Sequence, residues 1–199
     1  MTQASNGEEF SQQASDFYPG IRKQMPASYG TQLSNLYHSI VCSNFSIKQT
    51  AQAKTILSAF SITTTPPNKL KPIQMVPHFD STANKQYAVI HYLCDKAHGG
   101  TSFYRHKSTG FERITEQKIS QYGQVLKQQA LAENLHLKAQ YIEGDTPLFE
   151  RIFSVEAKMN RAIIFPSNML HSGNIKPEAG LISCPKKGRL TVSSFIVIE

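Results

Sequence analysis

Two side chains that commonly bind metal ions, His78 and Asp80, stand two residues apart in the stretch QMVPHFD. A run rich in apolar, aromatic and β-branched residues, QYAVIHYLC, follows and predicts a strand. The stretch with His78 and Asp80 is itself expected to be a strand, where residues two apart point to the same face, so the imidazole and the carboxylate are presented together. A His-x-Asp pair also arises by chance, so a metal site needs a further ligand from elsewhere in the chain.

His171, in the stretch RAIIFPSNMLHSG, is the candidate third ligand, because it follows an apolar strand-like run and a turn that contains proline. By itself it is equally well explained as a surface histidine. Together with His78 and Asp80 it supplies two imidazoles and one carboxylate. This is the ligand set of the facial triad in non-heme Fe(II) oxygenases, which leaves coordination positions open. The three residues are therefore predicted to form a catalytic iron site.

Near the end of the chain, GRLTVSSF places Arg189 at the start of the last predicted strand and Thr191 two residues later, on the same face. A guanidinium buried at this point would need an anionic partner, which a paired contact with a carboxylate would supply. An exposed arginine at the start of a strand is the simpler alternative. Considered alone, the residue is better explained as an exposed arginine.

The first part of the chain is expected to be helical. Residues 1–15, rich in Ser, Gln and Glu, predict a disordered tail, and residues 16–199 a single domain. A helical buttress is expected over about 17–58, with an amphipathic helix at 29–42 and a weaker helix at 48–58. The apolar positions of the amphipathic helix are Leu33, Leu36, Tyr37, Ile40 and Val41.

Short strand-like runs dominate the rest of the chain. They are AFSITTT, KPIQMVPHFD, QYAVIHYLC, GGTSFYRH, LFERIFSVEA, RAIIFP and RLTVSSFIVIE. Between the fourth and fifth, a helical insertion is expected at about 115–135, with Thr115 as its N-cap. Many short strands joined by Gly and Pro turns favour an all-β core with flanking helices, an α+β protein built as a sandwich or barrel.

Composition narrows the possible partners and compartment. The chain has 199 residues, 40% hydrophobic and 18% charged, and a formal net charge of +7. Nucleic acid is disfavoured as a partner, because the sequence patterns of common binding modules are missing. Cys42, Cys94 and Cys184 form no CxxC pair, which favours a reducing compartment. The sequence has no signal peptide and no apolar run long enough to cross a membrane, so a cytoplasmic protein without membrane contact is expected.

The series His78-x-Asp80, YAVIHYLC, GGTSFY, IIFPSNMLHSG and RLTVSSF resembles the 2-oxoglutarate/Fe(II) dioxygenases, specifically the prolyl-4-hydroxylase-like branch. These pieces occur in the order of that family, over about residues 74–199. The local stretches DFYPGIR and GGTSFYRHKSTGFE are similar to those of a small group of uncharacterised bacterial proteins. The resemblance implies a double-stranded β-helix, or jelly-roll, barrel buttressed by N-terminal helices.

The resemblance also implies a ligand set. Fe(II) would be bound by the two histidines and the aspartate, with 2-oxoglutarate as co-substrate. Arg189 would bind the distal carboxylate of 2-oxoglutarate, with Tyr92 as a hydrogen-bond partner and Thr191 as a possible helper. The loop before Arg189 is longer than in many relatives, which makes Lys186 and Lys187 rival carboxylate binders.

The implied function is hydroxylation, using O₂, of a peptide side chain, an amino acid or a small metabolite. Relatives that halogenate replace the carboxylate ligand with a small residue. Asp80 therefore favours hydroxylation, or a demethylation that begins with hydroxylation. The alternative is a non-catalytic, cupin-like β-helix that binds metal as a sensor or scaffold, although cupins usually have His-x-His. A homodimer is an open possibility.

Overall fold

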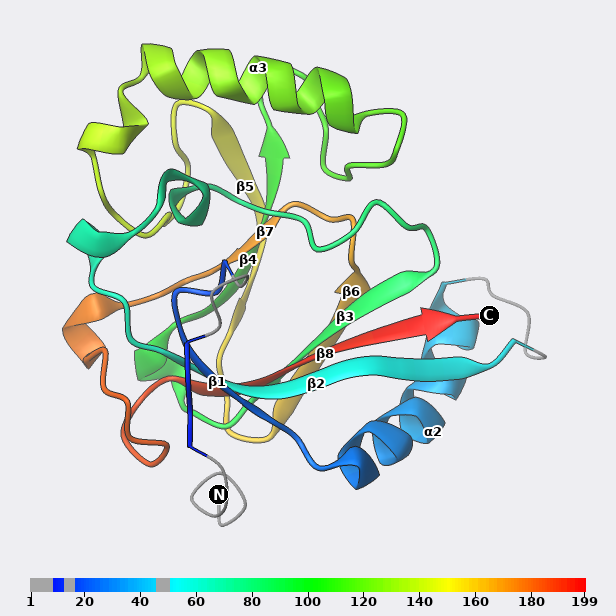
Figure 1. Cartoon of the computed structure of the whole chain (residues 1–199). Coiled ribbons are helices and arrows are strands. Elements are labelled where there is room, and N and C mark those ends of the chain that lie inside the picture. The colour runs from blue at the N-terminus through cyan, green and yellow to red at the C-terminus, as the bar shows by residue number, and fades with distance from the viewer. Residues whose placement is uncertain (1–8, 13–16, 46–50) are drawn as a thin grey trace.

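The computed structural model describes residues 9–12, 17–45 and 51–199. Figure 1 shows an assembly of strands with two α-helices on its outside. The strands are β1 (Gly20–Gln24), β2 (Ala53–Thr63), β3 (Gln86–Tyr92), β4 (Gly100–His106), β5 (Phe149–Glu156), β6 (Arg161–Pro166), β7 (His171–Gly173) and β8 (Leu190–Ile198). The helices are α2 (Ala27–Asn44) and α3 (Ile119–Ala132), with 3₁₀ turns η1 (Pro67–Lys69), η2 (Pro72–Met75), η3 (Lys96–His98), η4 (Leu135–Leu137) and η5 (Pro177–Ala179).

The strands form two open antiparallel sheets. The larger has the order β1-β2-β8-β3-β6, and the smaller has the order β5-β4-β7. Within the described residues no ladder joins the two sheets into a closed barrel. The predicted α+β class, with a β core and flanking helices, is therefore confirmed, whereas a closed barrel is not formed.

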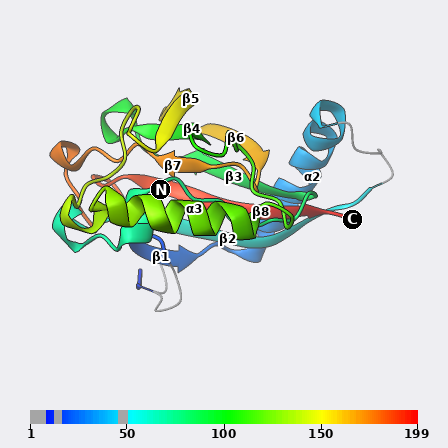
Figure 2. The ribbon, with the colours of Figure 1, turned by 90° about the horizontal axis from the view of Figure 1, so that it is seen from above.

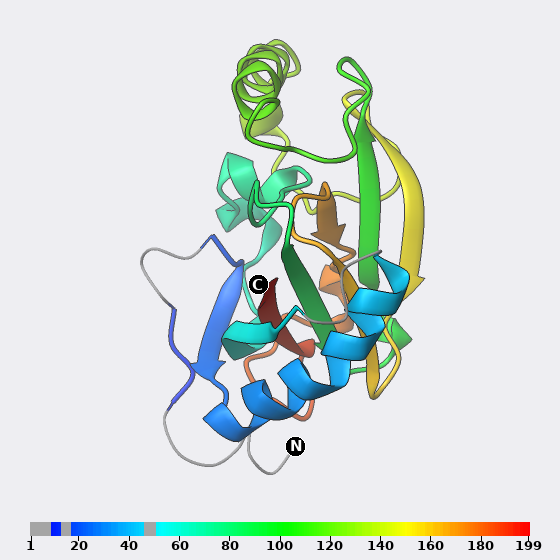
Figure 3. The same cartoon turned by 90° about the vertical axis from the view of Figure 1, so that its right-hand side faces the viewer.

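The two faces of the five-stranded sheet have different partners, because successive side chains of a strand alternate between faces. On the face turned toward the smaller sheet, which we call the inner face, Ala88 and Phe165 pack against Phe103 of β4. On the outer face, Tyr87 of β3 and Ile196 of β8 belong to the cluster that packs under α2. Figure 3 shows α2 lying against this outer side of the sheet.

The predicted amphipathic helix is confirmed as α2, which begins directly after Pro26. Leu33 and Val41 are buried against the sheet, but Leu36 is 60% exposed and Ile40 is 37% exposed. The side chain of Tyr37 lies outside the described residues. The face that α2 buries is therefore narrower than the run of apolar residues suggested.

Three local expectations are wrong. The segment expected to be a second helix at 48–58 becomes the strand β2 from Ala53 onward, because pairing with both β1 and β8 overrides a weak helical propensity. Residues 48–50 lie outside the described residues. The run at 71–80 is a 3₁₀ turn followed by one isolated bridge, since its two prolines lack the N–H groups that a ladder needs. The helix α3 begins at Ile119 without a side-chain cap, so Thr115 is not its N-cap.

The predicted strand AFSITTT forms the second part of β2, and the remaining predicted strands occur as β3, β4, β5, β6 and β8. In the expected tail at 1–15, residues 9–12 are described, and Ser11 forms an antiparallel bridge with Arg22 of β1. The rest of that tail lies outside the described residues. None of the helices in the described part of the chain is long and apolar enough to cross a membrane.

The helical insertion packs at one end of the molecule, and the view from above shows α3 crossing over the strands at that end (Figure 2). Tyr122 of α3 is 4% exposed and joins a cluster that includes Val76, Ile114 and Leu170. Phe79, which lies between His78 and Asp80, packs against the same cluster. The insertion therefore closes a hydrophobic core directly behind the segment that carries two of the candidate ligands.

Leu33 and Leu36 lie on the same helix but differ in burial, so their substitution by alanine can be compared directly. Leu33→Ala should lower the free energy of unfolding by about 2–5 kcal/mol, because Leu33 is 5% exposed against the outer face of the sheet. Leu36→Ala removes the same atoms from the solvent side of the same helix and should change it by less than about 0.5 kcal/mol. Urea unfolding of both variants measures the difference. Equal effects would show that α2 does not pack in this orientation.

Candidate metal centre

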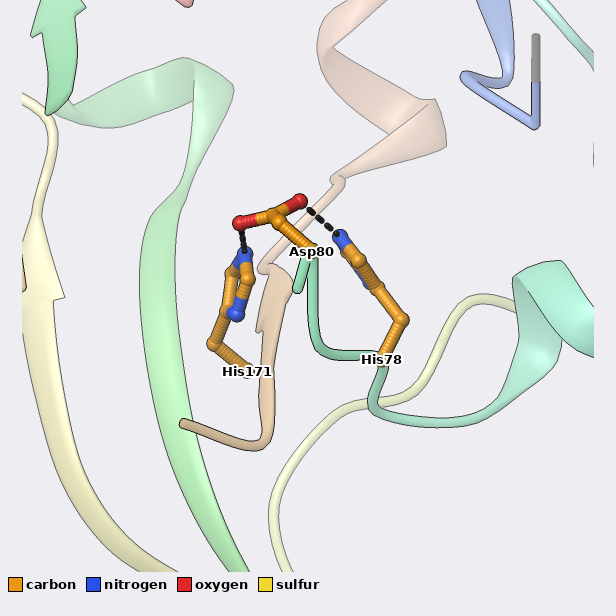
Figure 4. A group of neighbouring side chains, drawn as sticks. All are labelled: His78, Asp80 and His171. Atoms are coloured by element: carbon orange, nitrogen blue, oxygen red, sulfur yellow. Dashed lines mark ion pairs between the residues drawn. The ribbon is translucent and has the colours of Figure 1, made fainter. Parts of the chain in front are cut away.

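The structure brings the three predicted ligands together. His78, Asp80 and His171 each present a ligand atom, and these atoms lie within 4.8 Å of one another. Asp80 Oδ1 lies 3.8 Å from His78 Nε2, and Asp80 Oδ2 lies 3.6 Å from His171 Nε2. Figure 4 shows the carboxylate between the two rings, with both Nε2 atoms facing it. Two neutral nitrogen donors and one carboxylate directed at a common point are a suitable set for a divalent transition-metal ion.

Backbone hydrogen bonds bring these distant segments into contact. His78 N–H donates to the carbonyl of His171 over 2.9 Å, and His171 N–H donates back to the carbonyl of His78 over 2.8 Å. Asp80 N–H donates to the carbonyl of Ser167 over 2.8 Å. The expectation that His78 and Asp80 share a continuous strand is therefore wrong. They converge because both are fastened to the chain around β7.

Hydrophobic contacts hold the same segments from behind. Leu170, next to His171, is fully buried in the cluster that Tyr122 and Phe79 share. The rings of Phe79 and Tyr122 meet edge to face, with centroids 6.3 Å apart. The side chains that flank the ligands thus anchor the ligands' backbone in a packed core, which limits how far the donor atoms can separate.

One hydrogen bond defines the tautomer of His171. Its Nδ1 lies 2.9 Å from the carbonyl oxygen of Met169, and a carbonyl can only accept, so Nδ1 carries the proton. The Nε2 lone pair of His171 then faces Asp80. This is the arrangement that metal-binding histidines usually have, with the second ring nitrogen donating to a carbonyl. In the absence of a cation, the lone pair would face a carboxylate at close range.

The surroundings of the two rings differ. The side chain of His171 is 6% exposed and that of His78 is 48% exposed. Phe165 packs edge to face on His171 with ring centroids 4.6 Å apart, and Phe103 lies 6.4 Å from it. The cluster is therefore apolar on the side of His171 and open to solvent on the side of His78.

The protonation states favour metal binding near neutral pH. Burial, followed by the neighbouring His171 and Arg22, lowers the pKa of His78 well below its ordinary value, although about half of this side chain still meets solvent. Burial also raises the pKa of Asp80, while His171 and Arg22 act in the opposite direction. His78 is thus held neutral, which is the form that binds a metal.

The predicted carboxylate-binding residues lie on the inner face of the larger sheet. Arg189 is 6% exposed; its Nη2 donates to the carbonyl of Gly100 over 2.9 Å, while its buried Nε has no hydrogen-bond partner among the described residues. Tyr92 is fully buried, and its hydroxyl donates to Thr101 Oγ1 over 2.6 Å. Thr191 is the register partner of Tyr92.

Strand register extends this pair into a row across the whole sheet. The residues of this inner row, from β1 to β6, are Arg22, Ser61, Thr191, Tyr92 and Arg161. Arg189 stands two residues before Thr191, on the same face. Sequence reasoning missed Arg22, because its place beside these residues depends on pairing across strands that are far apart in the chain.

The turn at Gly99 and Gly100 supports Arg189 directly. Gly99 has a φ of +88°, and a Cβ there would lie 1.6 Å from the carbonyl oxygen of Asn174. Only glycine fits this turn into β4. The carbonyl of the next residue, Gly100, accepts the hydrogen bond from Arg189. The turn therefore helps to orient the guanidinium.

Other candidates lie away from the cluster. Lys186 and Lys187 are exposed, and the Lys187 carbonyl lies 3.0 Å from His98 Nε2. His91 faces the outer side of the sheet, where its ring nitrogens meet the Tyr29 hydroxyl and the Asn160 side chain. His91 is thus a packing residue of the outer face.

A hollow in the surface lies apart from the metal cluster. It opens between Met75 and the segment 133–149, beside α3, and its lining mixes apolar and acidic side chains. None of the three metal-ligand candidates lines it. We assign the chemistry to the His-Asp-His cluster, because that cluster has convergent donor atoms and the hollow does not.

Fold and site together define an α+β protein with two facing sheets and a candidate metal centre at β7. The chain matches the Family of unknown function (DUF6445) over residues 1–196, and it belongs to that family. Comparison with curated proteins gave no match, and neither did comparison with solved structures. Membership of this family assigns no activity, so the chemistry of the centre rests on its own residues.

Metal affinity should fall as the pH is lowered. A proton on His78 or on Asp80 displaces the metal, and the raised pKa of Asp80 brings this competition to higher pH than for an ordinary aspartate. Titration with Co(II), followed by its visible absorption, should give at least about tenfold weaker binding at about pH 5 than at about pH 7.5. His91→Ala removes an imidazole from the outer face and should leave the profile unchanged. If Co(II) binding did not depend on pH, or if it were lost in His91→Ala, the metal would bind at a site other than the His-Asp-His cluster.

Proposed function

We propose that this protein is an Fe(II)- and 2-oxoglutarate-dependent dioxygenase that hydroxylates its substrate. The observation that carries the proposal is the convergence of His78, Asp80 and His171, with the Nε2 lone pair of His171 directed at the cluster by its bond to Met169. Two imidazoles and one carboxylate on a site with an open side suit Fe(II) and leave room for a chelating co-substrate.

The strand pairing supports a double-stranded β-helix as the finer description of the fold. We take β2 as the first strand and the His78 bridge as a short second one. The antiparallel pairs are then first with eighth, second with seventh, third with sixth, and fourth with fifth. This nested pattern arises when one long hairpin rolls up into two facing sheets, as in a jelly roll. In this description β1 is an added strand at one edge.

The residues present fit an iron ion. His171 is held in the correct tautomer, His78 is kept neutral, and Asp80 supplies the anionic donor. When bound, iron would supply the oxidising chemistry that couples decarboxylation of 2-oxoglutarate to succinate with hydroxylation of the substrate. The protein's own contribution is to orient the donors and to keep the side of His171 dry with Phe103 and Phe165.

Arg189 is the residue suited to bind the distal carboxylate of 2-oxoglutarate. Its guanidinium is buried on the inner face, and its Nε lacks a partner among the described residues. A buried cation with an unused donor is costly unless an anion binds there. Thr191 lies on the same face. The Tyr92 hydroxyl donates its proton to Thr101 in this structure, so in this state Tyr92 can assist only as an acceptor or as packing.

The direct test is an anaerobic titration of the protein with Fe(II) and 2-oxoglutarate. A chelate of the co-substrate on Fe(II) should give a visible charge-transfer band in the wild-type protein. Asp80→Ala should lose both the band and tight Fe(II) binding, because it removes the anionic ligand. Tight Fe(II) binding without any band would instead support a non-catalytic, cupin-like metal module. Wild-type Fe(II) affinity in Asp80→Ala would exclude the site itself.

Arg189 provides a quantitative test. Arg189→Ala should weaken 2-oxoglutarate binding by at least about tenfold, since a charge-assisted hydrogen bond in a buried pocket contributes more than about 1.4 kcal/mol. Arg189→Lys keeps the charge and should lose less. Fe(II) affinity measured without 2-oxoglutarate should barely change in either variant.

The matched control is Lys187→Ala, which removes an exposed cation from the loop that precedes Arg189. It should bind 2-oxoglutarate as the wild type does. If the Lys187 variant lost 2-oxoglutarate while Arg189→Ala retained it, the co-substrate carboxylate would have to bind at the loop and not on the inner face.

A further inference from the structure

His98 joins the two segments that hold Arg189 in place. It is the last residue of η3 and stands two residues before Gly100, whose carbonyl accepts the hydrogen bond from Arg189. Its Nε2 lies 3.0 Å from the carbonyl oxygen of Lys187, two residues before Arg189 on the other segment. One imidazole therefore bridges the turn that leads into β4 and the turn that leads into β8.

The two contacts of the His98 ring require it to carry two protons. A carbonyl oxygen can only accept a hydrogen bond, so Nε2 donates to Lys187. Nδ1 lies 3.1 Å from Oδ1 of Asp95, and an ionised carboxylate can also only accept. The hydrogen bonds from His98 and from the Ala97 N–H lower the pKa of the Asp95 carboxyl, which keeps it ionised. Both ring nitrogens therefore donate, so the ring is an imidazolium.

A neutral His98 ring cannot make both contacts. If Nε2 keeps the proton, the Nδ1 lone pair faces the Asp95 carboxylate, and if Nδ1 keeps it, the Nε2 lone pair faces the Lys187 carbonyl oxygen. In either case one of the two contacts becomes repulsive. The bridge therefore weakens when the pH rises through the range in which histidine side chains lose their second proton.

Charged side chains occur on both segments around His98. Asp95 and Lys96 come from η3 and its N-cap, and Lys186 and Lys187 come from the turn before β8; all four are exposed. The side chain of His98 is only 16% exposed, and within the described part of the chain Asp95 is the one carboxylate in ion-pair contact with its ring. Asp95 is therefore the residue to change in order to alter the charge of His98 without removing the ring.

The turn that carries the Lys187 carbonyl is tightly folded. The N–H groups of Lys187 and Gly188 both donate to the carbonyl of Cys184. A Cβ at Gly188 would lie 2.1 Å from the carbonyl oxygen of Ile182, so this position admits only glycine. Arg189 follows directly. A displacement of this turn would therefore also displace the guanidinium that the Gly100 carbonyl orients.

We infer that His98 is a positioning residue for Arg189 and makes the binding of 2-oxoglutarate depend on pH, because only the charged ring fastens the turn before β8 to η3 through both contacts. This inference rests on the proposed function. Binding of the co-substrate carboxylate weakens as the pH rises and His98 loses its charge. This dependence is opposite in direction to that of metal binding, which weakens as the pH falls.

The experiment measures 2-oxoglutarate affinity by isothermal titration calorimetry at about pH 6 and about pH 8.5, on either side of the usual titration range of histidine. The full chain is saturated with Zn(II), which has no redox chemistry, so that binding is observed without turnover. The loss of affinity between the two pH values should be at least about threefold larger in the wild type than in Asp95→Asn, as expected for one hydrogen bond.

Two variants test the two partners of the bridge separately. In Asp95→Asn the side-chain oxygen can still accept from the Ala97 N–H while the amide nitrogen donates to Nδ1 of a neutral His98, so both contacts of the ring survive at high pH. His98→Gln removes the titrating ring and should also lose the additional pH dependence. His136→Gln is the matched control, because it removes an exposed imidazole from η4, and it should keep the wild-type dependence.

The charge of His98 is measured independently by ¹⁵N NMR of the histidine rings, in the full chain without metal or 2-oxoglutarate. The ring signals that are absent in His98→Gln identify His98. Both of its nitrogens should be protonated at about pH 6, and one of them at about pH 8.5.

The inference is overturned if the wild type depends on pH no more than Asp95→Asn does, if His98→Gln retains the dependence, or if His136→Gln loses it. A single proton on the His98 ring at about pH 6 would overturn it as well. Binding of 2-oxoglutarate without this pH dependence contradicts the inference alone. If the wild type with metal binds no 2-oxoglutarate at either pH, the proposed function fails and the inference fails with it.

Discussion

The reciprocal pair of backbone hydrogen bonds between His78 and His171 is the interaction on which the candidate site depends. Neither segment is a long strand: β7 has three residues, and the His78 segment contributes a single bridge. Yet this bridge sets two imidazoles side by side, with ring centroids 4.3 Å apart. The position of Asp80 is set in a similar way, because its N–H donates to the carbonyl of Ser167, just before β7. This short bridge thus acquires a fixed geometry from the hydrophobic cluster against which Phe79 and Leu170 pack.

The second constraint on the structure is the burial of polar and charged side chains on the inner face. A space between two sheets is usually filled by apolar side chains, and that is true around Ala88, Phe103 and Phe165. One end of this same face instead carries arginine, serine, threonine and tyrosine, largely out of contact with water. Burying these groups costs stability unless they find partners. This change of polarity within a single sheet is one of the observations that support the proposed co-substrate site.

The sequence was most informative where the structure depends on residue type or on the pattern of apolar residues along a strand. His78, Asp80 and His171 could be chosen by residue type, and the strands β3, β4, β6 and β8 by their apolar runs, because both signals are local. The first part of β2, residues 53–58, was misjudged as helix, since its partners come from both ends of the chain. Arg22 could not be found for the same reason: only the register across β1, β2 and β8 places it in the same row as Thr191, with Ser61 of β2 between them. The orientation of Arg189 likewise depends on a distant group, the carbonyl of Gly100 at the start of β4.

The nesting of the strands determines when during folding the metal site can appear. The hydrogen bond between Ser58 of β2 and Ser194 of β8 joins residues 136 positions apart, and the His78 bridge lies inside that loop. Contacts so distant in the sequence form slowly, because much chain entropy is lost before they become favourable. A nascent chain on the ribosome would therefore lack the complete ligand set until β7 had emerged. Because the His78–His171 bridge spans fewer residues than the pairing of β2 with β8, the candidate ligand set can assemble before the two ends of the chain join.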